Sequence, residues 1–246
     1  MTQSSLFKRV LLASSIALCY SGAALAVAVP SYGNIADPPG VYFGAGNVNG
    51  NWTIVTNNNV EVALRAKNRG TLATINGSSG IYSTAQGLCN PVCGGGPKAT
   101  WNYEFSVNTK ADGTGALTLS DVLVELLVDT DPSASTSFTT LNALTQWSDT
   151  AFWKTSLPHR RLGNGPLSGE FGAQQSENPA FADSGFGFVP GPGLYDLVLR
   201  VSDREGTLLA SVDAKVQVVP EPQSVALFAL GLASLAAMRR RKAKQS

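Results

Sequence analysis

Apolar and polar side chains alternate along several stretches of the chain, and this period of two is typical of half-buried β-strands. Residues 60–67 (VEVALRAK) are apolar at every second position, and so are residues 101–107 (WNYEFSV). Residues 195–218 predict a hairpin, because two alternating runs flank a turn at residues 203–206 (DREG). We expect antiparallel strands with one face on a core and the other in water.

The segment at residues 119–131 (LSDVLVELLVDTD) fits two different elements. A helical stripe would use Leu119, Val122, Leu123 and Leu126, whereas a strand would use Val122, Val124, Leu126 and Val128. The valine content and the DTDP sequence at the end favour the strand.

The longest stretch without alternation is residues 133–192, where Gly, Ser, Asn and Pro are frequent. This composition predicts long loops with room for one short helix. Strands on both sides of it predict an all-β fold, and the closing hairpin favours an antiparallel two-sheet β-sandwich of the immunoglobulin-like or jelly-roll-like kind.

The first 26 residues have the pattern of a secretory signal peptide. A short basic region precedes an apolar stretch at residues 10–18, and small residues follow in an A-x-A arrangement at Ala24 and Ala26. We expect cleavage after Ala26, with Ala28 as the alternative.

The chain closes with a Pro-Glu-Pro triplet, an uncharged apolar run at residues 224–238 and five basic residues in the six positions that follow. As a helix the run would be about 22 Å long, which is short of the ~30 Å hydrocarbon core of a bilayer. The basic cluster favours the cytoplasmic side, with the body outside. We therefore expect a transient membrane segment, and three regions: a signal peptide (1–26), a β-sandwich body (27–219) and a sorting or anchor segment (220–246).

This tripartite tail resembles the PEP-CTERM sorting signal of Gram-negative bacteria. The resemblance implies that a membrane enzyme of the exosortase type cleaves near the triplet and passes the protein to the cell surface or extracellular matrix, commonly in species that make exopolysaccharide. By position, the implied recognition triplet is Pro220, Glu221 and Pro222, and the implied retention charges are Arg239, Arg240 and Arg241. The resemblance assigns no family to the body.

The two ends of the chain are basic, whereas the stretch between them is acidic. Seven of the 18 Lys and Arg residues lie near the two ends of the chain, so the 11 that remain face all 17 Asp and Glu, and the stretch from Asp37 to Glu221 has a net charge of −6. This is the wrong sign for binding a polyanion by counterion release, which argues against nucleic acid as a partner.

Two cysteines, Cys89 and Cys93, remain after the signal peptide is removed. An even count in an exported chain, with a turn-forming Asn-Pro between the two, predicts a disulfide. A metal site is the alternative, but His159 is the only histidine that could contribute to it.

No catalytic signature stands out. His159 lies in a loop-like sequence, and the chain has no G-x-S-x-G elbow. A pair of carboxylates could hydrolyse a glycoside without histidine, but sequence spacing cannot bring two of them together. The available carboxylates are Glu61, Glu104, Glu125 and Glu170.

Binding has two sets of candidate residues. Asp129 and Asp131 could hold Ca²⁺ through oxygen ligands, although Asp before Pro is also ordinary turn chemistry. Trp147 and Trp153, in loop-like sequence, could stack on a glycan. We predict an exported, surface-sorted, non-enzymatic structural or interaction protein without a cofactor; the alternatives are a carbohydrate-binding module and, third, a glycan-active hydrolase.

Overall fold

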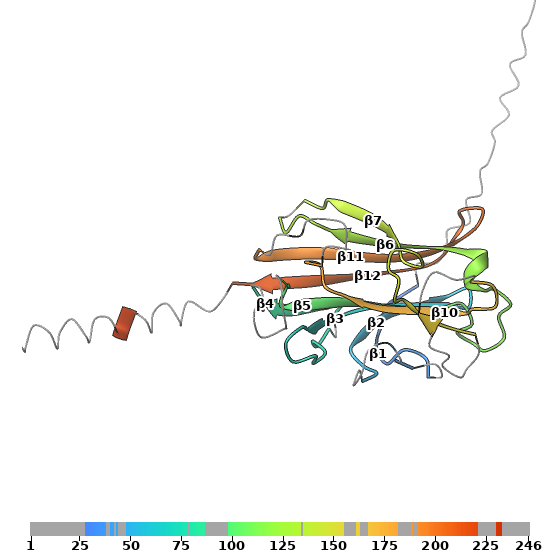
Figure 1. Ribbon diagram of the computed structural model, residues 1–246, viewed down its shortest axis with the longest axis horizontal. Coiled ribbons are helices and arrows are strands. Elements are labelled where there is room, and N and C mark those ends of the chain that lie inside the picture. Colours follow the sequence, from blue (N-terminus) through green and yellow to red (C-terminus); the bar gives the residue numbers. More distant parts are fainter. Residues whose placement is uncertain are drawn as a thin grey trace, which may run out of the picture.

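The chain folds into two β-sheets that pack face to face, as Figure 1 shows. The computed structural model describes residues 28–37, 40–41, 43, 48–77, 79–86, 98–133, 135–154, 161–162, 167–181, 188, 191–220 and 230–232. The predicted all-β two-sheet sandwich is confirmed.

The larger sheet has seven strands in the order β1-β2-β3-β5-β10-β8-β9, and neighbouring strands are antiparallel. Its strands are β1 (Ser31–Gly33), β2 (Trp52–Asn57), β3 (Val60–Asn68), β5 (Trp101–Asn108), β8 (Ala151–Trp153), β9 (Arg161–Leu162) and β10 (Gly172–Glu177).

The smaller sheet has five strands in the order β4-β12-β11-β6-β7. Its strands are β4 (Ile81–Ala85), β6 (Val122–Asp129), β7 (Phe138–Asn142), β11 (Gly193–Asp203) and β12 (Leu208–Val219). The pairing of β4 with β12 is parallel, and the other pairs in this sheet are antiparallel.

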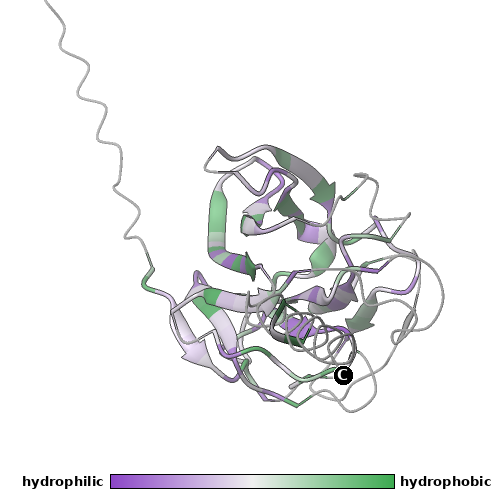
Figure 2. Cartoon of the chain, turned by 90° about the vertical axis from the view of Figure 1, so that its left-hand side faces the viewer, coloured by the Kyte–Doolittle hydropathy of each residue, from purple (hydrophilic) through white to green (hydrophobic). Residues whose placement is uncertain are grey.

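The core lies between the sheets, where the alternating apolar residues of each strand meet. Trp101 and Tyr103 of β5 pack with Tyr195 of β11, and the ring centroids of Trp101 and Tyr195 are 5.8 Å apart. The strands in Figure 2 are accordingly banded in hydrophobic and hydrophilic colours.

The structure confirms the predicted hairpin and shows which element residues 119–131 form. The β11–β12 turn closes with hydrogen bonds from Asp203 N–H to the Thr207 carbonyl and from Gly206 N–H to the Asp203 carbonyl. Gly206 has φ +89°, a conformation that favours glycine. Residues 122–129 form strand β6 as predicted, and only Leu119–Asp121 before it makes a 3₁₀ turn, whose Leu119 is buried.

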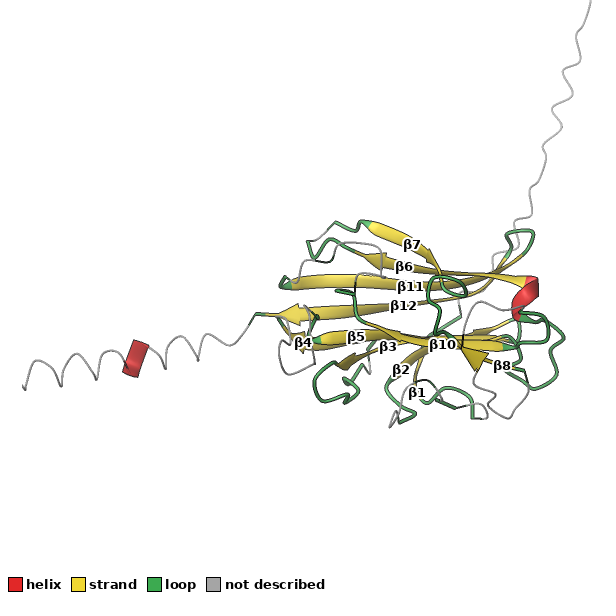
Figure 3. Ribbon diagram, viewed as in Figure 1, coloured by secondary structure: helices red, strands yellow, loops and turns green. Residues whose placement is uncertain are grey.

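Residues 133–192, predicted as long loops with room for one short helix, also contribute four short strands, β7, β8, β9 and β10, and the described part of this region contains no helix. Figure 3 shows how little helix the described chain contains. Strand β10 (GAQQSE) lies between β5 and β8, and all its residues except Ser176 are buried although most are polar. Without apolar alternation, such a strand leaves no pattern in the sequence.

The prediction that β3 and β5 are half-buried is also wrong. Their burial patterns show both faces covered, apart from Asn68 at the end of β3. On the outer face, the described residues 34–37, 40–41, 43 and 48–50 cover them, and Ile35 and Val41 pack on Trp52 and Ala63. We call these described residues the cover. The polar positions of these strands are therefore buried against a second layer of chain.

The two ends of the sequence are outside most of this description. The signal peptide lies outside the described residues, and the apolar run is described only at residues 230–232, which are helical. Among the helices of the described ranges, none has the length and apolar character that a membrane crossing needs.

Candidate functional site

The most unusual polar group of the body is an ion network buried on the outer face of the larger sheet. Arg65 and Lys67 project from β3, and Glu104 projects from β5 beside them. The Glu104 carboxylate lies 2.5 Å from Arg65 Nε and 2.5 Å from Lys67 Nζ. The three side chains are only 0%, 6% and 3% exposed for Arg65, Lys67 and Glu104, respectively. We call these three residues the ion network.

Arg65 also holds the covering segment in place. Its guanidinium carbon lies 4.1 Å from the centre of the Trp52 ring, which is a cation–π contact. Its Nη1 donates to the carbonyls of Val48 and Gly50 at 2.8 Å each. Because one side chain joins the sheet, the aromatic ring and the cover, the ion network has a structural role.

Further hydrogen bonds stabilise the cover and attach it to strands β3 and β10. Asn49 and Ile35 exchange two bonds within the cover, at 2.9 and 3.0 Å. Gln174 Nε2 donates to the Gly40 carbonyl at 2.9 Å. Ala36 N–H donates to the Glu61 carboxylate at 3.2 Å.

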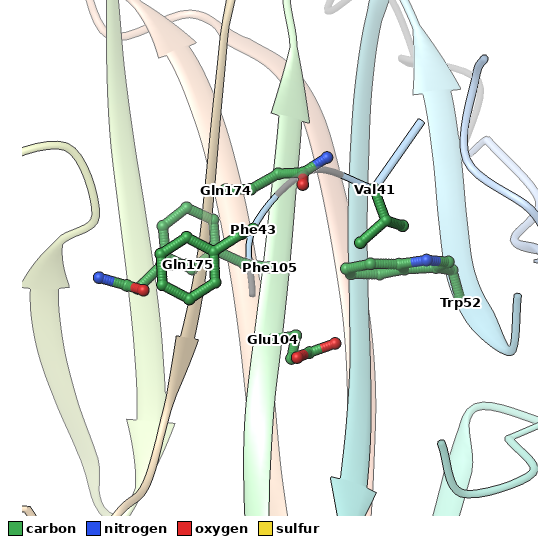
Figure 4. A pocket seen from close by; sticks show the side chains of 7 residues that line it. All are labelled: Val41, Phe43, Trp52, Glu104, Phe105, Gln174 and Gln175. Atoms are coloured by element: carbon green, nitrogen blue, oxygen red, sulfur yellow. The ribbon is translucent and has the colours of Figure 1, made fainter. Parts of the chain in front are cut away.

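A narrow gap between side chains lies beneath this cover, shown in Figure 4. It is too narrow for a water molecule. Its lining consists of Val41, Phe43, Trp52, Glu104, Phe105, Gln174 and Gln175. An interior this tightly packed is not a substrate pocket.

A wider hollow, with room of about 400 Å³, lies at the β2–β3 turn. Its lining consists of Thr56, Asn57, Asn58, Asn59, Glu61, Ala111 and Asp112. Turn chemistry explains much of this asparagine run: Asn58 and Asn59 have φ +48° and +62°, which asparagine tolerates well. The Nδ2 groups of Asn57 and Asn58 both donate to the Leu209 carbonyl, so they also tie this turn to β12.

Burial raises the pKa of the Glu61 carboxyl above its ordinary value of 4.5, and the hydrogen bond from Ala36 N–H opposes this by a smaller amount. The Glu61 carboxyl therefore binds its proton more tightly in the folded protein than in the unfolded chain, and protonation stabilises the fold. The stability that protonation contributes is lost as the pH rises through the raised pKa.

We expect Glu61→Gln to remove this pH dependence, because an amide keeps an acceptor for Ala36 N–H but does not titrate. The free energy of unfolding of the wild type minus that of the variant should fall as the pH rises above about 4.5, through the raised pKa of Glu61. Urea unfolding across this range measures it, with the exposed Glu125→Gln as control. A difference that stays constant with pH would contradict the burial effect.

The structure does not support the two tryptophans as a glycan platform. Trp147 and Trp153 are 2% and 3% exposed, and Trp147 packs on Phe105 with ring centroids 6.0 Å apart. The Trp153 ring lies against Gly172, where an added Cβ would come within 1.8 Å of a ring carbon. Both rings are core residues, because their loop-like sequence folds back onto the larger sheet.

The candidate calcium residues instead organise a turn. Asp129 Oδ1 accepts from the N–H groups of Asp131 and Ser137, at 3.0 and 2.8 Å. The Asp131 carboxylate accepts from the N–H and hydroxyl of Ser133 and from the Ser135 hydroxyl. Within the described ranges, no three His, Cys, Asp or Glu side chains are grouped to hold a metal.

The four candidate catalytic carboxylates lie on separate parts of the fold. Glu61 is on β3 and Glu104 on β5, whereas Glu125 is exposed on β6 of the other sheet and Glu170 is buried in a loop. Glu104 is already bound to two cations. The other residues singled out from the sequence lie outside the described residues: Ala24, Ala26, Cys89, Cys93, His159, Glu221, Pro222, Arg239, Arg240 and Arg241.

Sequence reasoning missed the ion network. Its signal was present, because Arg65 and Lys67 occupy the polar positions of one strand and Glu104 a polar position of another. Their burial could not be read there, since it depends on the cover between Asn34 and Gly50.

Comparison with known proteins identifies the tail alone. A family model described as the PEP-CTERM protein-sorting motif matches residues 218–242, a range that contains the Pro-Glu-Pro triplet and Arg239 to Arg241. No curated protein and no solved structure matches the chain. The motif is a recognition signal for exosortase processing and indicates export and sorting to the cell surface. The chain thus carries a PEP-CTERM sorting motif directly after its β-sandwich, as expected of a PEP-CTERM protein whose body has no assigned family.

Proposed function

We propose that this protein is exported through the inner membrane, anchored briefly by residues 224–238, and released at the cell surface as a non-enzymatic structural or interaction component. The observation that carries the proposal is the sorting motif, which begins at residue 218 within the last strand of the body. An exosortase-type membrane enzyme is the processing partner, and exopolysaccharide of the surface matrix is the expected surrounding.

The buried polar groups of the body favour an architectural role over catalysis. The charges of the ion network are paired with one another, and Arg65 also bonds the cover. Asp129 Oδ1 and the Asp131 carboxylate accept hydrogen bonds within a turn. A nucleophile or general acid needs access to a substrate, which the buried ion network does not offer.

Glycan binding is the second candidate, and the hollow at the β2–β3 turn favours it. Its asparagine and carboxylate side chains are of the kind that hydrogen-bond sugar hydroxyls, and its volume of about 400 Å³ is within the range of small-ligand sites. Such a site would bind a sugar by hydrogen bonds to its hydroxyl groups and not by aromatic stacking, since the tryptophans proposed for stacking are in the core.

Processing can be tested in the native host by mass spectrometry of protein from the cell surface. We expect a new C-terminus near Pro220 to Pro222 and loss of Arg239, because the short apolar run and its basic stop serve only sorting. A variant with Pro220, Glu221 and Pro222 all changed to alanine should keep its tail and stay in the membrane fraction. Wild-type surface protein with an intact tail would refute the proposal.

A further inference from the structure

The folded body ends without a linker before the sorting tail. Strand β12 ends at Val219, and the N–H of Gln86 still donates to the Val219 carbonyl at 2.9 Å. The next residue, Pro220, opens the Pro-Glu-Pro triplet. The position of the body relative to the anchor is therefore constrained by very few residues.

The reach of those residues can be bounded. From Val219 to Ser224, where the apolar run begins, five residues span at most about 17 Å when fully extended. Lipid headgroups occupy roughly 5 to 7 Å on each side of the hydrocarbon core. While the run is in the bilayer, the end of the sandwich at Val219 lies about a Debye length from the lipid surface or closer. This step rests on the proposed function.

Three chain segments form that end of the sandwich around Val219. The N–H of Arg69 donates to the Thr100 carbonyl at 2.8 Å, and the Thr100 hydroxyl donates to the Ala85 carbonyl at 2.6 Å. Ala85 is paired with Val219 in the β4–β12 ladder. We define the exit corner as residues 68–72, 85–86, 98–100 and Val219. In Figure 3, β4 lies at the end where the arrowhead of β12 finishes.

The exit corner carries basic and apolar side chains. The Arg69 guanidinium and the Lys98 ammonium both lie over the ring of Phe181, at 5.3 and 5.8 Å from its centre. In the part of the chain that the structure describes, Arg69 has no carboxylate partner. Leu72 and Val219 are 52% and 40% exposed.

Two described carboxylates lie near the exit corner. Glu177 of β10 is buried, and the next residue, Asn178, exchanges hydrogen bonds with Ala99. Asp131 lies at the same end of the molecule but follows β6, two strands from β12 in the sheet. The opposite end bears most of the turn carboxylates, namely Asp112, Asp121, Asp203 and Glu205, beside Lys110 and Arg204. The stretch from Asp37 to Glu221 has a net charge of −6, yet the exit corner presents the cations of Arg69 and Lys98 where the membrane anchor begins.

We propose that the exit corner is a membrane-contact surface, which binds an anionic lipid bilayer while the tail is anchored. Arg69 and Lys98 face the lipid phosphates, Leu72 and Val219 enter the headgroup region, and the acidic end points away from the bilayer. This contact orients the body and leaves the Pro-Glu-Pro triplet at the headgroup level.

The test uses the full chain reconstituted in vesicles without any processing enzyme. Hydrogen–deuterium exchange of residues 68–72 and 98–100 is compared between vesicles of phosphatidylcholine alone and vesicles with about 30 mol% phosphatidylglycerol. We expect several-fold slower exchange in the anionic vesicles, and loss of this protection in about 0.5 M salt. The double variant Arg69→Gln, Lys98→Gln should lose the protection.

The matched control is Lys110→Gln, Arg204→Gln, which removes the same charge at the opposite end and should keep the protection. The salt arm uses the wild type, so it decides the question even if the Arg69 and Lys98 variant is locally perturbed. Equal exchange in the two vesicle types, or protection that salt leaves intact, overturns the proposal. Neither outcome affects the processing experiment, which tests surface sorting by the identity of the C-terminus.

Discussion

Replacing Glu104 by alanine is expected to lower the free energy of unfolding by about 3 to 5 kcal/mol, the usual cost of breaking a buried ion pair. The change leaves the cations of Arg65 and Lys67 buried without their shared counter-charge. Urea unfolding followed by tryptophan fluorescence measures the change, because Trp52 stacks directly on Arg65. The hydrogen bonds from Arg65 to Val48 and Gly50 should weaken with it, so the cover should also exchange its amide protons faster.

The control is Glu125→Ala, which removes an exposed carboxylate from β6 in the other sheet. We expect this variant to stay within about 0.5 kcal/mol of the wild type. A second arm changes Arg65 and Lys67 to methionine together with Glu104→Leu, which should restore much of the lost stability, since apolar residues often replace buried ion networks without loss. Equal effects of Glu104→Ala and Glu125→Ala would show that the ion network does not stabilise the fold.

The inner faces of the strands could be predicted from the sequence because one periodicity describes them. Val62, Leu64 and Ala66 of β3 alternate with polar residues and are buried in the core between the sheets. The same pattern suggested water on the other face, which is where the prediction failed. Arg65 is buried by a segment that is distant in sequence and has no periodicity of its own, so its environment is a property of the tertiary structure.

Strand β10 failed for a related reason. Its Gln174 donates to Ser106 of β5 and to the cover, and its Gln175 donates to Asp149. Both side chains are 1% exposed, so hydrogen bonds replace the apolar contacts that a sequence pattern could register. The tail was predicted correctly because its signal is local: the triplet, the apolar run and the basic cluster are adjacent in the chain.

Trp147 is another residue whose environment the sequence did not show: the loop-like sequence around it suggested exposure, whereas the structure places it in the core. We expect Trp147→Ala to lower the free energy of unfolding by about 3 to 5 kcal/mol, the usual cost of removing a buried large aromatic side chain. The loss comes from the cavity beside Phe105 and from the apolar area that the ring no longer buries. Thermal and urea unfolding of the variant measure it.

Phe138→Ala is the matched control, since Phe138 is an aromatic residue on β7 that is 40% exposed. Phe138→Ala should lower the free energy of unfolding clearly less than Trp147→Ala does, because a partly buried side chain contributes a smaller transfer free energy and its removal leaves no closed cavity.

The two variants also distinguish a role of Trp147 in packing from a role in glycan recognition. If Trp147→Ala kept wild-type stability and lost binding to a polysaccharide, the ring would have to be accessible, and its placement in the core would be wrong. If stability falls and the folded fraction of the variant still binds as the wild type does, Trp147 serves the fold, and recognition of a glycan has to come from polar groups such as those at the β2–β3 turn.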